Sequence, residues 1–375
     1  MIPSLISGQS NYDSKKNWLE KLHLDGWLLL GLLLILMTSL LTVYSASGGD
    51  WHVTQSHGFR ILFALSLMFL IAQVSPSKMA LFTPWIFFFA LLLLIAVLLV
   101  GDIGKGAQRW LDLGIIRFQP SEIMKLALPM MVAWLFAYTD FPAPPSRFIL
   151  GIATIVVTTS LIVVQPDLGT SILIAMSGLF VLFFAGLPWK VIFAAIATAG
   201  ISAPIAWNFM HAYQKQRVLT FLDPESDPLG SGYHIIQSKI AIGSGGIDGK
   251  GFMGSTQAHL EFLPESTTDF IFSVFAEEFG LIGVAFLLVL YTFVLARGLY
   301  IAYRAKDNFS RLIAASFTMT VFIYVTVNIG MVSGLLPVVG LPLPLISYGG
   351  SSMVTLMISF GILMSIQTHK PFAAD

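Results

Sequence analysis

Three carboxylates recur at every fourth position in a polar stretch of the chain: Glu261, Glu265 and Asp269. Pro264 lies between them, so the three cannot share one continuous helical face. Asp269 comes directly before an apolar run that begins at Phe270. A carboxylate that is partly removed from water at the end of a membrane helix is suited to general-base catalysis. The simpler alternative is that Asp269 only caps the helix that follows it.

Three cations, Arg109, Arg117 and Lys125, lie in or just after a polar insert at residues 101–120, which also contains Gln119. Arginine presents forked hydrogen-bond donors that match phosphate oxygens, so this group suits a phosphorylated substrate or a pyrophosphate leaving group. The alternative is that isolated arginines extend to the phosphates of the surrounding lipid. Both interpretations place the three cations near one membrane surface.

Glu122 and Lys125 are three residues apart at the start of an apolar segment, which places them on one side of a helix. They are either a charged pair that lines an interior cavity or a salt bridge that joins helices. We expect them to face protein, because two charges that face lipid would be costly. Asp167, in the tight turn at residues 165–170, is either a helix cap or part of the mouth of such a cavity.

Other classes of site find little support in the composition. Cysteine is absent, which excludes disulfides, thiol catalysis and thiolate metal sites. The histidines have no metal-ligand spacing, and the formal net charge of zero gives no argument for a nucleic-acid partner. The glycine-rich segment at residues 243–251 matches no Walker pattern, so we interpret it as turns rather than as a phosphate cradle.

The elements that must position these residues are membrane helices. The chain has 375 residues, of which 56% are hydrophobic and 11% are charged, whereas a soluble domain carries about 25% charged residues. The hydrophobic blocks are about 17–25 residues long, which is enough to cross a bilayer. We predict one all-α polytopic membrane domain over residues 1–375 with about ten transmembrane helices. They are expected near residues 27–46, 58–75, 79–100, 121–138, 148–165, 169–187, 189–209, 270–296, 310–333 and 351–368.

The distribution of charge orients these helices. One set of short loops, together with the C-terminal end, carries eight of the 20 Lys and Arg residues: Lys78, Arg147, Lys190, Arg297, Arg304, Lys306, Arg311 and Lys370. The positive-inside rule makes this face cytoplasmic, together with the retained N-terminal arm at residues 1–26 and the C-terminus. The large loop at residues 210–269, between helices seven and eight, is then extracytoplasmic. Residues 334–352 contain three prolines and are predicted to form a re-entrant segment.

Five motifs occur in order along the chain: Gly106-Ala-Gln-Arg-Trp110, Gln119-Pro-Ser-Glu122 with Lys125, Gln165-Pro-Asp-Leu-Gly-Thr170, Leu260-Glu-Phe-Leu-Pro-Glu265 with Thr268-Asp-Phe-Ile-Phe272, and Pro342-Leu-Pro-Leu-Ile-Ser-Tyr-Gly-Gly-Ser-Ser352. Together they resemble the SEDS family over nearly the whole chain outside the N-terminal arm. Within that family the chain is most similar to the RodA branch, rather than to FtsW or SpoVE. One departure is the sequence Gly254-Ser-Thr-Gln257, where family members often have Gly-Thr-Gln.

The resemblance implies a peptidoglycan glycosyltransferase of cell elongation. Such an enzyme polymerises lipid II, a disaccharide-pentapeptide linked to undecaprenyl pyrophosphate, on the periplasmic face of the bacterial inner membrane. The catalytic acid of the family falls on Asp269, and its functional polar residues fall on Arg109, Glu122 and Lys125. The implied partners are a class B penicillin-binding protein transpeptidase, the rod-shape elongation complex and membrane lipid.

This chemistry needs one displacement with inversion, because lipid II is α-linked to pyrophosphate and the glycan bond is β-1,4. Asp269 is the candidate base. The candidate substrate-binding residues are Arg109, Arg117, Gln119, Glu122, Lys125, Asp167, Glu261 and Glu265. No cofactor is predicted, although a divalent cation is a further candidate for binding the pyrophosphate.

Two other functions are compatible with the helix count. A lipid II flippase would need a polar path through the bilayer, whereas almost all the acids of this chain are predicted to lie outside it. A non-catalytic scaffold that activates a transpeptidase would not need its loop carboxylates. Polymerisation of purified lipid II by the purified protein distinguishes the three.

Overall fold

The structure is a computed structural model that describes residues 18–104, 107–112, 117–165, 167–210, 212–226, 230–260, 262–263 and 265–369. Ten helices of at least 15 residues occupy these ranges. They are α2 (Gly26–Ala46), α3 (Trp51–Ala72), α4 (Pro76–Val100), α5 (Pro120–Trp134), α6 (Pro145–Val164), α7 (Leu168–Phe184), α8 (Trp189–Phe209), α12 (Ile271–Arg304), α13 (Asn308–Val332) and α14 (Ser351–Thr368).

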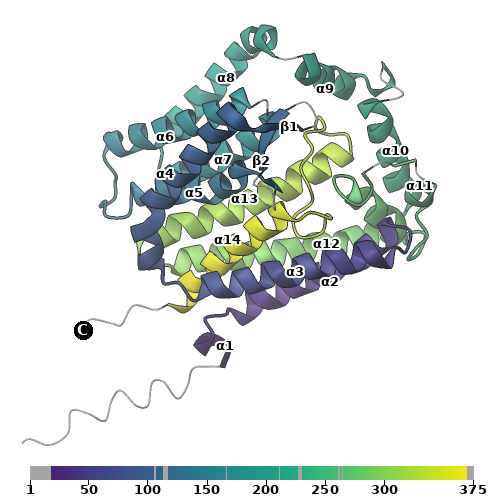
Figure 1. Ribbon diagram of the computed structural model, residues 1–375, viewed down its shortest axis with the longest axis horizontal. Helices are drawn as coiled ribbons and strands as arrows, with labels where there is room; N and C mark the ends of the chain where they lie inside the picture. Colours follow the sequence, from purple (N-terminus) through teal and green to yellow (C-terminus); the bar gives the residue numbers. More distant parts are fainter. Residues whose placement is uncertain are drawn as a thin grey trace, which may run out of the picture.

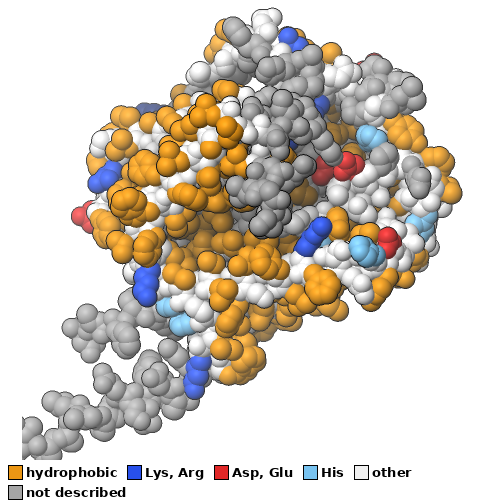
Figure 2. Space-filling model, viewed as in Figure 1, with side chains coloured by type: hydrophobic (Ala, Val, Ile, Leu, Met, Phe, Trp, Pro, Cys, Tyr) orange, Lys and Arg blue, Asp and Glu red, His pale blue; other side chains and the backbone are white. Residues whose placement is uncertain are grey.

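Seven of these helices are long and apolar enough to cross a bilayer by length and composition: α2, α3, α4, α6, α12, α13 and α14. α7 is a shorter apolar helix, and hydrophobic side chains cover much of the molecular face in Figure 2. The predicted all-α, multi-pass membrane class is therefore confirmed. The count of ten crossings stays a prediction, although each of the ten helices overlaps a range expected from the sequence.

Two helix boundaries differ from the sequence prediction for identifiable reasons. α3 begins at Trp51 rather than near residue 58, because the Asp50 carboxylate caps it by accepting hydrogen bonds from the backbone N–H groups of His52 and Val53. α12 continues to Arg304 rather than ending near residue 296. Its C-terminal part is fixed by the Arg297 guanidinium, whose Nη2 lies 2.6 Å from Oδ2 of Asp25.

The two ends of the described chain lie together. The imidazole rings of His23 and His369 are stacked with centroids 3.9 Å apart, and α1 (Trp18–Lys21) lies at the same end of the bundle as the end of α14 (Figure 1). A chain with an even number of membrane crossings has both termini on the same side, so the contact agrees with an even count. α13 and α14 are central to the bundle, because 67% and 61% of their membrane-length windows are buried.

The polar insert after α4 forms a small antiparallel sheet in the order β1-β2-β3. Its strands are β1 (Asp102–Gly104), β2 (Ala107–Asp112) and β3 (Arg117–Phe118). β2 packs against both α4 and α5. The sheet therefore positions Arg109, on β2, beside the start of α5.

The segment predicted as a large loop contains helices of its own. They are α9 (Ala212–Leu222), the 3₁₀ turn η2 (Pro224–Ser226), α10 (Ser231–Ser244) and α11 (Thr256–His259). In Figure 1 they follow one edge of the bundle from α8 to α12. α10 packs on α12, and its Ile235 and Ala241 are buried. The apolar positions of this segment thus attach it to the bundle.

The glycine-rich segment joins this loop region to a break in α12. Gly280 has the non-helical torsions φ 59° and ψ −161°, and a Cβ added to it would meet the backbone N of Gly249 at 2.4 Å. Backbone hydrogen bonds from Lys250 to Glu277 and from Leu281 to Gly246 join the two segments. The interpretation as turns agrees with this geometry, since the glycines permit the close backbone contact.

Candidate active site

The segment that contains Asp269 is held by the irregular chain between α13 and α14. The Ser347 hydroxyl donates to the Thr268 carbonyl at 2.6 Å, and the Tyr348 backbone N–H donates to the Thr267 carbonyl at 2.8 Å. Residues 333–350 contain no helix, as their prolines and glycines predict. This irregular segment is therefore one wall of the region around Asp269.

Asn328, on α13, joins the same two segments from a fully buried position. Its Nδ2 donates to the Asp269 carbonyl at 3.0 Å and to the Leu341 carbonyl at 2.6 Å. Gly340 has φ +73°, and a Cβ added to it would lie 3.4 Å from Oδ2 of Asp269. The irregular segment thus passes directly beside the Asp269 carboxylate.

Asp269 lies one position before the N-capping residue of α12. The capping position of α12 is Phe270, whose side chain offers no acceptor. Asp269 itself is half-buried. Its fixed backbone and partial burial suit a reactive carboxylate, and its roles as a base and as a helix cap both stay predictions.

Of the other two carboxylates in the pattern, only Glu265 can be described, because Glu261 lies outside the described residues. Glu265 is exposed and has φ 59°. Its Oε2 accepts a hydrogen bond from the Thr268 hydroxyl at 2.7 Å. The Glu265 side chain therefore closes the turn that leads into Asp269.

A second group forms around Asp167 at the start of α7. Asp167 Oδ1 accepts from the Thr170 backbone N–H, so the capping interpretation of this residue is correct. Its other oxygen, Oδ2, lies 3.5 Å from Arg109 Nε and 3.4 Å from Gln119 Nε2. Asp167 therefore also orients Arg109. Of Arg117, only its strand position opposite Asp112 is described.

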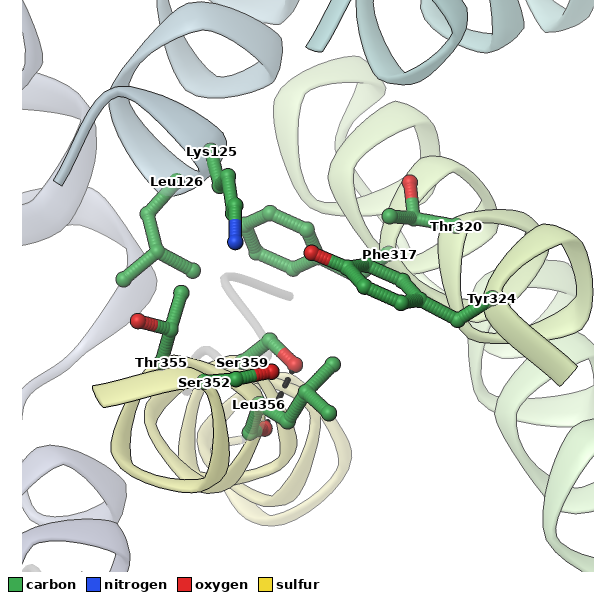
Figure 3. A pocket seen from close by; sticks show the side chains of 9 residues that line it. All are labelled: Lys125, Leu126, Phe317, Thr320, Tyr324, Ser352, Thr355, Leu356 and Ser359. Carbon is green, nitrogen blue, oxygen red and sulfur yellow. Dashed lines mark hydrogen bonds between the residues drawn. The ribbon is translucent and has the colours of Figure 1, made fainter. Parts of the chain in front are cut away.

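A third group lines a cavity between α5, α13 and α14, shown in Figure 3. Lys125 Nζ lies 2.7 Å from Glu122 Oε1, and the Thr355 hydroxyl donates to Glu122 Oε2 at 2.8 Å. The ammonium also lies 5.5 Å from the centre of the Tyr324 ring. Both side chains are largely enclosed by protein, and Lys125 lines the cavity while Glu122 holds it from behind through the salt bridge.

Two contacts of α13 and the irregular segment bring the three groups into one region. Tyr324 and Asn328 are four residues apart on one side of α13, so the Lys125 cavity adjoins the contact to Asp269. A Cβ added to Gly169 would lie 3.0 Å from the Val339 carbonyl, which places the start of α7 beside the segment that reaches Asp269. Residues far apart in the sequence thus converge.

Sequence reasoning missed two buried carboxylates on α12, Glu277 and Glu278, which are 0% and 1% exposed. Glu277 accepts hydrogen bonds from Lys250 Nζ and from the Ser255 hydroxyl, both at 2.6 Å. Glu278 accepts from the Ser45 hydroxyl. The sequence did contain a signal for these residues, because two adjacent acids inside an apolar helix are costly unless each has a partner.

Among the residues that the structure describes, no three His, Asp or Glu side chains lie close enough together to hold a metal ion. The divalent cation suggested for the pyrophosphate therefore stays a prediction.

Comparisons with known proteins agree with the motifs. Residues 18–371 match the family model of FtsW, RodA and SpoVE, described as cell cycle protein. The chain is 54% identical over 360 residues to the peptidoglycan glycosyltransferase MrdB of Escherichia coli K12, covering 95% of this chain and 97% of that protein. It is 35% identical to the probable peptidoglycan glycosyltransferase FtsW of Aliivibrio salmonicida, covering 91% and 87%.

Solved structures give the same family. The fold matches a chain from a peptidoglycan synthase complex that coordinates polymerization and crosslinking, with a TM-score of 0.79, 33% identity, and coverage of 92% of this chain and 97% of that one. It also matches the rod shape determining protein RodA of Thermus thermophilus, with a TM-score of 0.72, 27% identity, and coverage of 95% and 100%.

The Glu277 contacts generate a stability prediction. We expect Glu277→Ala to lower the free energy of unfolding by at least about 3 kcal/mol, because hydrogen bonds to a charged acceptor contribute about 1.5–3 kcal/mol each. Limited proteolysis should also cut residues 250–260 faster. Glu225→Ala, at an exposed carboxylate, is the control for both measurements. Equal thermal unfolding of the two variants would contradict the role given to Glu277.

Proposed function

The chain belongs to the SEDS family of FtsW, RodA and SpoVE proteins, and on that premise we propose that it is a peptidoglycan glycosyltransferase with Asp269 as its general base. The MrdB and FtsW relatives are both named as peptidoglycan glycosyltransferases, the FtsW relative as a probable one, which supports the activity. The observation that carries the residue assignment is the half-buried Asp269, whose backbone is fixed by Asn328 at the edge of the irregular segment.

The reaction is one displacement at the anomeric carbon of a lipid-linked donor. The 4-hydroxyl oxygen of the acceptor sugar forms the new β-1,4 bond, while the bond from the anomeric carbon to the pyrophosphate oxygen breaks. The Asp269 carboxylate takes the proton of the attacking hydroxyl. Undecaprenyl pyrophosphate leaves with the bonding electrons, so the products balance without any further reactant. Lipid II is the substrate that fits these requirements.

The cations stabilise the leaving pyrophosphate. Arg109 is oriented for this by Asp167, which also accepts a hydrogen bond from Gln119, and Arg117 and Lys125 are the other proposed contacts. Glu122 holds Lys125 at the cavity wall. Glu261 and Glu265 remain proposed contacts to the substrate at the mouth of the site.

We further propose that the site opens on the periplasmic face of the bacterial inner membrane, with both termini cytoplasmic. The Lys and Arg distribution supports this orientation. A solved relative belongs to a synthase complex that joins polymerization to crosslinking. This supports a class B penicillin-binding protein transpeptidase as partner, within the rod-shape elongation complex.

The first prediction from this proposal tests the base. Asp269→Asn should lower the rate of lipid II polymerisation by about 10²–10⁴-fold, because it removes the proton acceptor. Folding should persist, since Asn328 bonds the backbone carbonyl of residue 269 rather than its side chain. Asp248→Asn, at an exposed acid of the same outer region, is the control. Near-normal polymerisation by folded Asp269→Asn protein would contradict the assignment.

The second prediction concerns the buried pair. Glu122→Ala and Lys125→Ala should each destabilise the protein by about 3–5 kcal/mol, because one charge is left buried without its partner. The double variant Glu122→Gln with Lys125→Met should recover thermal stability in detergent much more than polymerase activity. Equal recovery of stability and activity would show that the pair is only structural.

The third prediction tests orientation, and it uses the absence of native cysteine. Single cysteines at the exposed positions Asp248 and Lys306 lie at opposite ends of the bundle. An impermeant thiol reagent applied to intact spheroplasts should label Asp248→Cys and leave Lys306→Cys unlabelled until the membrane is opened. The reverse pattern would remove the periplasmic active site.

The same polymerisation assay separates the rival functions. A flippase would move lipid II across vesicles without forming glycan, and a scaffold would keep its effect on the transpeptidase after Asp269→Asn. Glycan synthesis by the purified chain that depends on Asp269 would exclude both.

A further inference from the structure

Arg60 is the single Lys, Arg, Asp or Glu residue of α3. It lies nine positions after Trp51, about 14 Å along a helix that is long and apolar enough to span a membrane. A charge at such a depth is costly in lipid and is a functional hypothesis by default. Nothing in the mechanism above uses this residue.

The guanidinium of Arg60 is directed toward protein rather than lipid. Its Cζ lies 4.2 Å from the centre of the Tyr348 ring, and its Cδ lies 3.9 Å from the Cβ position of Gly350. His57, one turn earlier on α3, is fully buried, whereas Phe59 is 72% exposed on the outer side of the helix. Arg60 therefore lies on the edge of the protein-facing side and is half-buried.

Arg60 has no counterion in the described part of the chain. Four other cations of the described residues are each paired with a carboxylate: Arg109 with Asp167, Lys125 with Glu122, Lys250 with Glu277 and Arg297 with Asp25. The Arg60 guanidinium stacks on the aromatic face of Tyr348 and donates no hydrogen bond to a described residue. A guanidinium has five N–H donors, so stacking on a ring leaves them available to an anion.

The contact connects Arg60 to the candidate active site. The backbone N–H of Tyr348 bonds the Thr267 carbonyl, two residues before Asp269. The Arg109–Asp167 group adjoins the same irregular segment at Val339, through Gly169. Two cationic positions therefore flank Asp269, at opposite ends of residues 339–348.

Glycan polymerisation has a matching requirement. Donor and acceptor are both lipid-linked, so two pyrophosphates must be held at once, although only the donor's pyrophosphate leaves. The leaving group develops charge and suits the larger group of cations at Arg109, Arg117 and Lys125. The acceptor's pyrophosphate is only anchored, which one preoriented arginine can do.

We propose that Arg60, stacked on Tyr348, is a second pyrophosphate-binding residue that positions the lipid-linked acceptor. This inference rests on the proposed function for the identity of the ligand. The binding experiment does not depend on catalysis, so it can refute the Arg60 site without refuting the proposed function, and the reverse.

The experiment measures binding of undecaprenyl pyrophosphate to the purified full-length protein in detergent, with undecaprenol as the ligand that lacks phosphate. We expect the native chain to bind two molecules of undecaprenyl pyrophosphate per protein. The Arg60→Gln variant should bind one molecule with native affinity and the second more weakly. The weakened site should lose about 10–100-fold in affinity, the range for a charge-assisted hydrogen bond. Arg60→Lys, which keeps the charge but not the fork, should lose less.

Arg311→Gln is the matched control, because the Arg311 guanidinium lies 5.2 Å from the Phe141 ring at the other end of the bundle. It should bind like the native chain. In polymerisation assays Arg60→Gln should raise the KM for lipid II with a smaller change in kcat. Tyr348→Leu should weaken the same site and also lower thermal stability, since the ring supports the arginine.

Three outcomes overturn the proposal. These are that Arg60→Gln binds two equivalents with native affinity, that phosphatidylglycerol displaces undecaprenyl pyrophosphate from the site at equal concentration, or that Arg60→Gln differs from the native chain in thermal stability alone. The second would assign Arg60 to lipid headgroups and the third to a purely structural role. A protein that binds two equivalents through Arg60 but makes no glycan would instead refute the proposed function and leave this site intact.

Discussion

The rest of the site depends on one constraint: backbone polar groups at membrane depth need hydrogen-bond partners within the protein. Residues 333–350 break the helical pattern, so the regular hydrogen bonds of a helix are not available to their carbonyls. Buried side chains supply the missing donors. Asn328 bonds Leu341, Ser39 bonds Ile346, and Tyr291 bonds Pro344. Each partner comes from a different helix, so the irregular segment is fixed by α13, α2 and α12 together.

The same contacts fix the position of Asp269. Asn328 bonds the Asp269 carbonyl with the amide group that also bonds Leu341, so the segment around Asp269 and the irregular segment are joined there. Ser347 adds a second link through Thr268. A base must be held within a narrow range of distance and angle from its proton donor. The hydrogen bonds that satisfy the irregular backbone would therefore also position Asp269 if it is the proposed base.

Electrostatics follow a second rule of the membrane environment, which is that buried charges are paired. Arg297 and Asp25 join α12 to the start of α2 at the end of the bundle where the termini meet. Glu277 and Lys250 attach the loop region to α12 at the other end. The pairs at Arg109 and Lys125 are close to the proposed chemistry, where a paired cation is held in place for an anionic substrate. Arg60 differs from all of these because an aromatic ring, rather than a carboxylate, holds it.

The sequence by itself determined the membrane class, the approximate place of the ten long helices and the residues worth testing, because hydrophobic length and charge at helix ends are local properties. It also indicated that residues 334–352 could not form an ordinary helix, since proline removes backbone donors. It left open whether Asp167 and Asp269 were caps, because aspartate before a helix is compatible with both roles. Only the tertiary structure decided that Asp167 caps α7 and orients Arg109, whereas Phe270 takes the capping position beside Asp269. It also revealed Glu277, Asn328 and Arg60, whose partners lie on segments distant in sequence, and contacts of that kind arise only when the helices pack.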